Sequence, residues 1–132
     1  MPIQVGLKGR AETTVTPQNT AVAMGSGHSP VFATPAMVAL MEQAAFTSLL
    51  PYLPEGEGTV GVHMDVVHES ASPVGMKVWA ESEVVSVDDR QIAFSVTAYD
   101  TTGPIGFGTH TRVRIGEERF AQRAQSKLGQ TT

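Results

Sequence analysis

The chain has no cysteine, few aromatic residues and no long apolar run. The absence of cysteine excludes disulfide bonds, thiolate metal ligands and a cysteine nucleophile. No uninterrupted apolar stretch approaches the ~18 residues of a transmembrane helix, so we expect no membrane partner. The first residues, Met1 to Gln4, lack the basic and then apolar pattern of a signal peptide. These absences together predict a cytoplasmic protein.

Charge of one sign does not dominate either, because nine basic side chains stand against 13 acidic ones among 132 residues. This mild acidity argues against nucleic acid as a partner. Residues 112–132 nevertheless carry a net charge of +3, which leaves −7 on residues 1–111. Such an end is typical of a helix with a solvated basic face or of a segment that contacts phosphate groups. The length predicts a single domain spanning residues 1–132.

One segment is predicted to be a buried helix. Thr34 and Pro35 resemble an N-cap followed by a first helical residue, and residues 36–50 are apolar on nearly all sides. Helices with that pattern are buried. Pro51 and Pro54 are expected to end the helix.

The rest of the chain is dominated by apolar residues that alternate with a period of two, which predicts strands. Four strands are expected, at residues 59–70, 76–87, 91–99 and 105–115. The residues expected to face inward are Val60, Val62, Met64 and Val66 in the first, Ile92, Phe94, Val96 and Ala98 in the third, and Ile105, Phe107, Val113 and Ile115 in the fourth. Residues 11–24 favour a strand interrupted by a turn, residues 1–10 look loosely held, and residues 117–128 favour an amphipathic helix.

The order of these elements predicts an α+β fold. Short turns between the strands favour an antiparallel sheet. A sheet with one apolar face can bury an apolar helix by wrapping around it. Because one sheet cannot cover the whole helix, we expect a second copy of the chain to complete the cover, giving a homodimer or a higher oligomer.

Glu42 and His68 are the first candidates for chemistry. Glu42 has apolar neighbours one turn away on either side, and an apolar environment raises the pKa of a carboxyl group toward the range used in acid–base catalysis. Alternatively, Glu42 lies on a solvent-exposed strip of the helix. His68 continues the even-numbered face of its strand toward the helix, so it is predicted to approach Glu42, as a catalytic group or as a core histidine bonded to a carbonyl.

The remaining polar residues are less specific. Thr34 has a sufficient structural role as an N-cap, and it also lies at a helix N-terminus, where developing negative charge is favoured. His63 and His110 are predicted to face outward with no role, and His28 lies in a loop that could border a pocket. With four scattered histidines and no paired spacing, we expect no metal site.

Several stretches of the sequence resemble the fluoroacetyl-CoA thioesterase family. They are residues 31–34, 37–42, 51–58, 68–75 and 105–112, with collinear spacing over roughly residues 11–120. The resemblance implies a hotdog fold, in which an antiparallel sheet wraps a long central helix, and a dimer with active sites at the subunit interface. It implies hydrolysis of an acyl-CoA thioester, with coenzyme A as part of the substrate and no other cofactor.

The resemblance also assigns residues. The threonine, glutamate and histidine of the family match Thr34, Glu42 and His68, and its pocket glycine and late arginine match Gly61 and Arg112. Arg112 is therefore expected to bind substrate through the coenzyme A phosphates or to form a surface ion pair. The fluoroacetyl-specific member has phenylalanines in the loop before the helix, where residues 24–28 here carry glycine and histidine. This departure predicts a different acyl group, with His28 as a substrate contact.

Glu42 is thus expected to act as general base or nucleophile, with His68 assisting proton transfer and Thr34 positioning the reacting groups. A water-attack route and a covalent anhydride at Glu42 both fit the sequence. Two other functions also fit: a hotdog enoyl-CoA hydratase, and a non-catalytic protein that binds acyl-CoA.

Overall fold

The computed structural model describes residues 2–129 and contains five strands and three α-helices in that range. The strands are β1 (Lys8–Thr14), β2 (Glu57–His68), β3 (Lys77–Asp88), β4 (Gln91–Asp100) and β5 (Gly103–Gly116). The α-helices are α1 (Ala21–Met24), α2 (Thr34–Leu49) and α3 (Glu117–Gln125), with 3₁₀ turns at Pro17–Asn19, Leu50–Tyr52 and Ser126–Gly129. No helix in the described range is long and apolar enough to cross a membrane.

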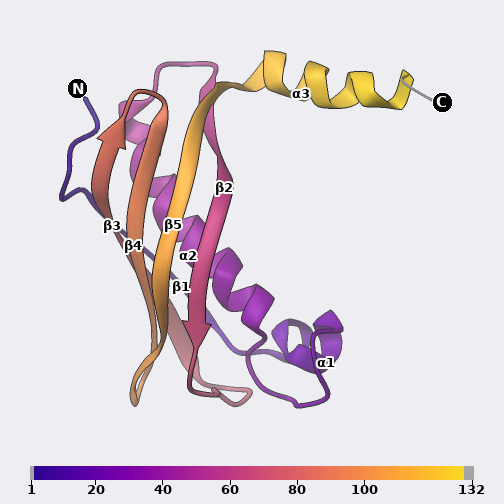
Figure 1. The fold of residues 1–132 in the computed structure, drawn as a ribbon. Helices are drawn as coiled ribbons and strands as arrows, with labels where there is room; N and C mark the ends of the chain where they lie inside the picture. The colour runs from indigo at the N-terminus through magenta and orange to yellow at the C-terminus, as the bar shows by residue number, and fades with distance from the viewer. Residues whose placement is uncertain (1, 130–132) are drawn as a thin grey trace.

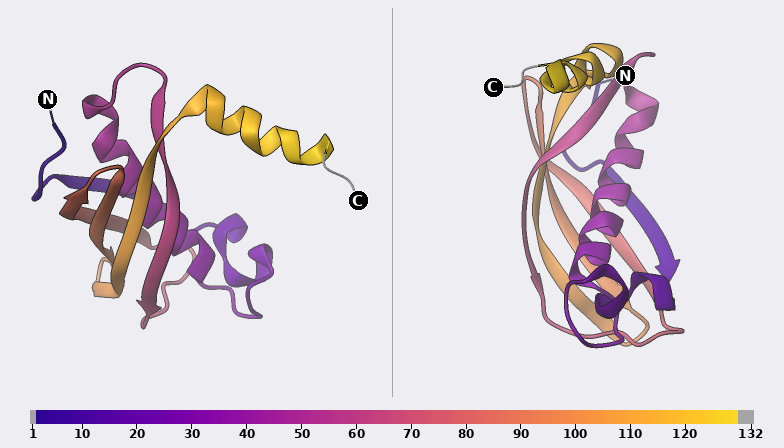
Figure 2. Two further views of the ribbon diagram at one scale, coloured as in Figure 1. Left: turned by 45° about the horizontal axis from the view of Figure 1, so that its top comes forward. Right: turned by 90° about the vertical axis from the view of Figure 1, so that its right-hand side faces the viewer.

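The five strands form one antiparallel sheet in the order β1-β3-β4-β5-β2. Helix α2 lies along one face of this twisted sheet (Figures 1 and 2). The α+β fold predicted from the sequence is therefore confirmed, and β2 is an edge strand with one side unpaired among residues 2–129. Figure 1 also shows that α3 leaves the end of β5 and points away from the sheet.

Helix α2 packs on the sheet through residues that are nearly inaccessible to solvent. These are Met37, Leu40, Met41, Ala44, Ala45 and Leu49. The opposite side is not covered within the chain, because Phe46 is 37% exposed and Leu50 is 50% exposed. The N-cap is Ala33, not Thr34, and it makes no side-chain cap hydrogen bond. The predicted capping role of Thr34 is therefore wrong, and its hydroxyl is free to bond elsewhere.

The predicted inward face of β4 is confirmed, since Ile92, Phe94, Val96 and Ala98 are all buried. In β5 the prediction fails after Ile105: Phe107 is 47% exposed, whereas His110 and Arg112 are buried. The cause is a register shift between Ala98 and Tyr99 of β4, opposite which Ile105 is an extra residue in β5. This extra residue exchanges the two faces of β5, so that even-numbered residues face inward after it.

A second irregularity lies in β2, where the register shifts between Gly61 and His63. Val62 is the extra residue and is 55% exposed, contrary to the prediction that it faces inward. Beyond this bulge, Met64 and Val66 pack partly buried against the core as predicted. The strand therefore presents odd-numbered residues to the helix before the bulge and even-numbered residues after it.

The two ends of the chain differ from the prediction to different degrees. Strand β1 begins at Lys8 and pairs with β3, so the last residues of the segment expected to be loosely held are part of the sheet. Only part of the predicted strand at 11–24 is a strand, because a 3₁₀ turn and α1 follow Thr14. The predicted helix at 117–128 is confirmed as α3 and a 3₁₀ turn, with no buried residue in either.

Candidate active site

Thr34 and His68 form a hydrogen-bonded pair where the first turn of α2 meets the end of β2. The Thr34 Oγ1 and His68 Nδ1 atoms lie 2.8 Å apart. Burial lowers the pKa of His68, so its imidazole is neutral at neutral pH. When Nδ1 is unprotonated, the threonine hydroxyl donates to it, as in other hydroxyl–imidazole pairs that carry out acyl transfer.

The remaining ring nitrogen of His68, Nε2, is buried and has no hydrogen-bond partner among the described residues. Buried polar atoms without partners are rare in folded proteins and often mark sites where stability is given up for function. The pair borders an open cavity of about 320 Å³, which Ser26 and Phe32 also line. The pair therefore lies where a small molecule can reach it.

His28 does not line this cavity. It is exposed in the loop after α1, and the neighbouring loop residue that lines the cavity is Ser26. A contact between His28 and substrate therefore stays a prediction.

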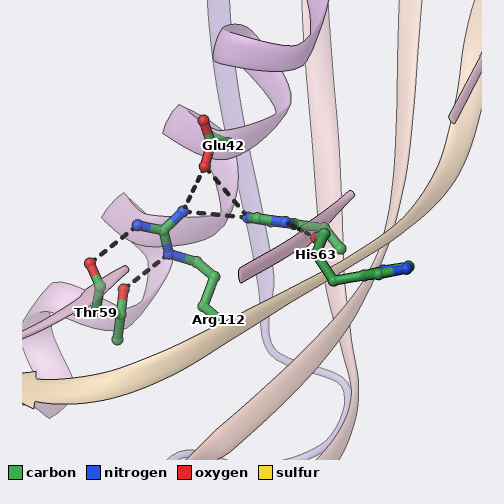
Figure 3. A network of polar contacts seen from close by, with 5 residues as sticks. Glu42, Thr59, His63 and Arg112 are labelled. Carbon is green, nitrogen blue, oxygen red and sulfur yellow. Dashed lines mark hydrogen bonds and ion pairs between the residues drawn. The ribbon is translucent and has the colours of Figure 1, made fainter. Parts of the chain in front are cut away.

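Glu42 belongs to a second cluster, farther along α2 and shown in Figure 3. Its Oε2 atom accepts a hydrogen bond of 3.2 Å from Arg112 Nη1. The other guanidinium nitrogens of Arg112 donate to Thr59, with 2.8 Å from Nε to Oγ1 and 3.0 Å from Nη2 to the carbonyl oxygen. The Phe46 ring covers Arg112, with its centroid 5.7 Å from Cζ. Arg112 is therefore held in one position, and Glu42 is paired, not isolated among apolar side chains as the sequence suggested.

His110 completes this second cluster. Its Nδ1 lies 2.8 Å from the His63 carbonyl oxygen, so Nδ1 carries a proton and donates it there. Its Nε2 then accepts from Arg112 Nη1 at 3.1 Å and lies 4.0 Å from Glu42 Oε2. Burial lowers the pKa of His110, and the neighbouring Arg112 charge lowers it further. A neutral His110 thus supports Arg112, and the prediction that it faces outward is wrong.

Gly61 lies against this cluster. A Cβ atom there would collide with Glu42 Oε2 and would lie 3.0 Å from His110 Cε1. Only glycine lets β2 pass so close to the carboxylate. The structure thus places Gly61 beside Glu42, and a pocket-lining role for Gly61 stays a prediction.

Within one chain the two clusters do not meet. No hydrogen bond or ion pair among residues 2–129 joins Glu42 to Thr34 or His68. Eight residues of α2 separate Thr34 from Glu42, which amounts to about 12 Å along a helix. The prediction that His68 approaches Glu42 is therefore not met within a single chain. The Glu42 side chain is 41% exposed on the uncovered side of α2, where a second molecule could reach it.

The sequence interpretation missed Thr59 and His110. A signal for His110 was present, because Gly106, Gly108, His110 and Arg112 alternate along one strand and so share a face. A Cβ atom at Gly106 would collide with the Met37 side chain, and one at Gly108 would collide with the backbone of β2. Glycine at both positions therefore lets α2 and β2 lie close to β5. Among residues 2–129, no group of three or more histidine, cysteine, aspartate or glutamate side chains is placed to hold a metal ion.

Comparisons with known proteins identify the family and agree with the fold. The family described as fluoroacetyl-CoA-specific thioesterase matches residues 15–118. The fluoroacetyl-CoA thioesterase of Streptantibioticus cattleyicolor is 41% identical over 97 residues, which cover 74% of this chain and 70% of the relative. The solved structure of the fluoroacetyl-CoA thioesterase FlK superposes with a TM-score of 0.91 at 34% identity, covering 96% of this chain and 98% of FlK. A hypothetical protein of Thermus thermophilus, a thioesterase superfamily member, gives a TM-score of 0.88 at 29% identity, with 98% of both chains covered.

Proposed function

The chain belongs to the family of fluoroacetyl-CoA-specific thioesterases and is a hotdog-fold acyl-CoA thioester hydrolase, and we propose that it acts on a small acyl group other than fluoroacetyl. The observation that carries the proposal is the 2.8 Å contact between Thr34 and His68 beside an open cavity. The cavity is bordered by Ser26 from a loop rich in glycine. Residues 24–28 of this loop contain no phenylalanine, and the neighbouring Phe32 is buried in the core, which supports a substrate that needs no aromatic cover from residues 24–28.

The proposed reaction uses Glu42 as the base. Its carboxylate removes a proton from water as the water oxygen bonds to the thioester carbonyl carbon. The backbone N–H groups of Thr34 and Ala36, in the first turn of α2, stabilise the negative oxygen that forms, while the Thr34 hydroxyl orients His68. The C–S bond then breaks, and the proton passes from Glu42 through His68 to the sulfur, giving a carboxylic acid and the coenzyme A thiol. No metal or organic cofactor is needed for these steps.

The alternative chemical route is attack by Glu42 itself, which would form an anhydride that water then hydrolyses. A single turnover in ¹⁸O-labelled water detects an anhydride that opens at the Glu42 carbonyl carbon, and trapping with hydroxylamine, which would leave a hydroxamate on Glu42, detects one that otherwise opens at the acyl carbon. Attack by water puts the label only in the released acid, whereas an anhydride opened at the Glu42 carbonyl carbon leaves it in the Glu42 side chain. We expect no label in the peptide that contains Glu42.

We propose further that the working form is a homodimer joined along β2. Val62 is 55% exposed and Val67 is 50% exposed on this edge strand, and Phe46 and Leu50 of α2 are exposed as well. Pairing β2 with the β2 of a second copy would satisfy the free backbone groups and cover the apolar side of α2. It would also let Glu42 of one subunit serve the Thr34–His68 pair of the other, which removes the problem of their separation.

Mixing two inactive variants tests this shared site. Glu42→Gln and His68→Ala each lack one half of every site, but a mixed dimer contains one complete site. Re-equilibrating equal amounts should therefore restore about a quarter of the wild-type activity. Mixtures that stay inactive, although mass analysis shows mixed dimers, would contradict a site shared between subunits.

Release of free thiol from a panel of short, branched and aromatic acyl-CoAs, including fluoroacetyl-CoA, tests the reaction itself. One non-fluorinated substrate should be preferred, and activity should be lost in Glu42→Gln and His68→Ala. The matched control is Glu55→Gln, whose side chain is exposed and outside both clusters. Water addition to an enoyl-CoA without thiol release would indicate a hydratase, and binding without any turnover would indicate an acyl-CoA-binding protein.

We also propose that the protein works in the cytoplasm. The support is its substrate class: coenzyme A thioesters carry several phosphate charges, and these cannot cross the apolar core of a membrane unaided. Fractionation of cells that express the chain at its native level would check this location.

A further inference from the structure

A hollow of about 360 Å³ lies where β5 ends and α3 begins, outside both clusters described above. Four arginines line it, namely Arg90, Arg114, Arg119 and Arg123, together with the ring of Phe120. Arg90 comes from the β3–β4 hairpin, and the others come from β5 and α3. Figure 1 shows how α3 leaves the sheet at this corner.

The positive charge of this hollow is only partly balanced. Arg114 binds Glu57 through two hydrogen bonds, of 3.0 Å from Nε and 2.7 Å from Nη2 to Oε1. Among residues 2–129, the other three arginines form no ion pair with a carboxylate. Asp89 and Glu57 border a smaller hollow beside it, which Arg90 and Arg114 share.

The acidic residues at the start of α3 do not fill the hollow. Glu117 approaches Gly58 of β2, and Glu118 is bonded to Gln122 on the helix surface. Arg119 and Arg123 are four residues apart, so they share one face of α3, and Phe120 lies beside Arg119 and Arg123 on that side. The helix thus presents two guanidinium groups and one aromatic ring to the same space.

The rest of the chain makes this concentration of charge stand out. Residues 1–111 carry a net charge of −7, so a highly charged anion is repelled by most of the molecule and attracted at this corner. Arg112, which the sequence suggested for binding phosphate, is unsuited to it, because it is 7% exposed and bonded to Glu42 and Thr59. The hollow begins directly after Arg112 on β5, about 7 Å along the strand for two residues.

We propose that this hollow binds the phosphorylated nucleotide end of the coenzyme A substrate, an inference that rests on the proposed thioesterase function. Guanidinium groups donate paired hydrogen bonds to phosphate oxygens, and Arg119 and Arg123 are free to do so. Phe120, which is 42% exposed, offers a flat face on which the adenine base stacks. The nucleotide end anchors the substrate while its thioester reaches the site near Glu42.

The test compares two forms of the preferred substrate: the acyl-CoA, and the same acyl group on pantetheine, which lacks the nucleotide. In the Arg119→Glu/Arg123→Glu variant, KM for the acyl-CoA should rise about tenfold or more with kcat within about twofold, as loss of two charge-assisted contacts predicts. Both constants for the pantetheine thioester should stay unchanged. The control is Lys127→Glu, which changes a charge on the same terminal segment outside the hollow.

An equal loss for both substrates, or an unchanged KM for the acyl-CoA, would overturn the proposal. Binding of adenosine 3′,5′-bisphosphate, measured by calorimetry, keeps the test independent of catalysis. The wild-type protein should bind it, the double variant and Phe120→Ala should bind it more weakly, and inorganic phosphate should compete poorly. If the wild type binds inorganic phosphate as well as the nucleotide, the hollow is a general anion site and the proposal fails. If no thioester is hydrolysed but the nucleotide still binds, the proposed reaction fails and the site stands.

Discussion

The two polar clusters along α2 are built in opposite ways. Thr34 and His68 share a single hydrogen bond beside an open cavity, and one nitrogen of His68 has no partner among the described residues. The Glu42 cluster is braced on several sides, because Arg112 alone donates to Glu42, Thr59 and His110. The first cluster can change its hydrogen bonds during a reaction. The second holds in one place the carboxylate that we propose as the base. The first is therefore suited to relaying a proton, and the second to positioning the group that first removes it.

Replacing His68 should separate the clusters most clearly. His68→Ala removes the group that moves the proton, so kcat/KM should fall about 10²–10⁴-fold. Stability should hardly change, because the variant also removes a buried nitrogen without a partner. Thiol release and thermal unfolding measure the two effects. A large drop in the unfolding temperature with activity retained would mean that His68 is mainly a core residue.

Adding one methyl group at Gly61 should disturb the braced cluster from the side of β2. The new Cβ meets the Glu42 carboxylate, so Glu42 must move, and a shift of about 1 Å can lower kcat/KM about 10²-fold. Gly129→Ala is the control, because a Cβ there meets nothing within 4 Å and Gly129 lies outside the hollow beside α3. Both variants should be assayed under the same conditions. Equal activities would show that the position of Glu42 is not critical.

Exchanging Arg112 for lysine keeps the positive charge but removes the two guanidinium hydrogen bonds to Thr59. We expect the free energy of unfolding to fall by about 1–2 kcal/mol and kcat/KM by about tenfold. Arg114→Lys is the matched control on the same strand. Its ion pair with Glu57 is about one-third exposed on both sides, so its loss should cost less than ~1 kcal/mol. Urea unfolding gives the free energy of unfolding of each variant, and thiol release gives kcat/KM. A larger loss of stability for Arg114→Lys than for Arg112→Lys would reverse the ranking of the two arginines.

The weakest expected effect is the dependence on pH. Burial lowers the pKa of both His68 and His110 in the folded state. Below the ordinary histidine pKa of 6.5 the unfolded chain therefore binds protons that the folded chain does not. Stability from this source is complete above pH 6.5 and is lost as the pH falls below it. His110→Gln should therefore lose less free energy of unfolding than the wild type when urea unfolding is compared between about pH 7 and pH 5. An equal loss in both proteins would contradict a lowered pKa for His110.

The sequence predicts this fold well wherever the strands are regular. In β4 the alternation runs without a break, so its four inward residues could be identified directly. In β5 and β2 a single extra residue shifts the alternation, and an apolar residue in a bulge looks the same in the sequence as one in a ladder. His110 was missed for this reason. The short β1 was only partly found because its first residues, Lys8 to Arg10, are polar or glycine.

The sequence predicts only in part which candidate residues lie together, and their roles in catalysis stay predictions. Gly61 and Glu42 do lie together, and Thr34 and His68 do lie together. Their division into two clusters depends on the length of α2 and on the orientation of β2, which no pattern of residue types reports. The same limit applies to Arg112, because exposed and buried arginines are identical in a sequence.

The bulge at Val62 determines which residues on either side of it face the helix. Before it, odd-numbered Thr59 and Gly61 face the helix, and after it, even-numbered Met64, Val66 and His68 are the partly buried residues. Both halves of the site are therefore on the helix side only because the count is offset by one. In this strand, the number of residues between Gly61 and Met64 therefore constrains the site more strictly than the identity of the residue at the bulge. A chain that lost Val62 would keep every chemical group of the site and turn half of them to the wrong face.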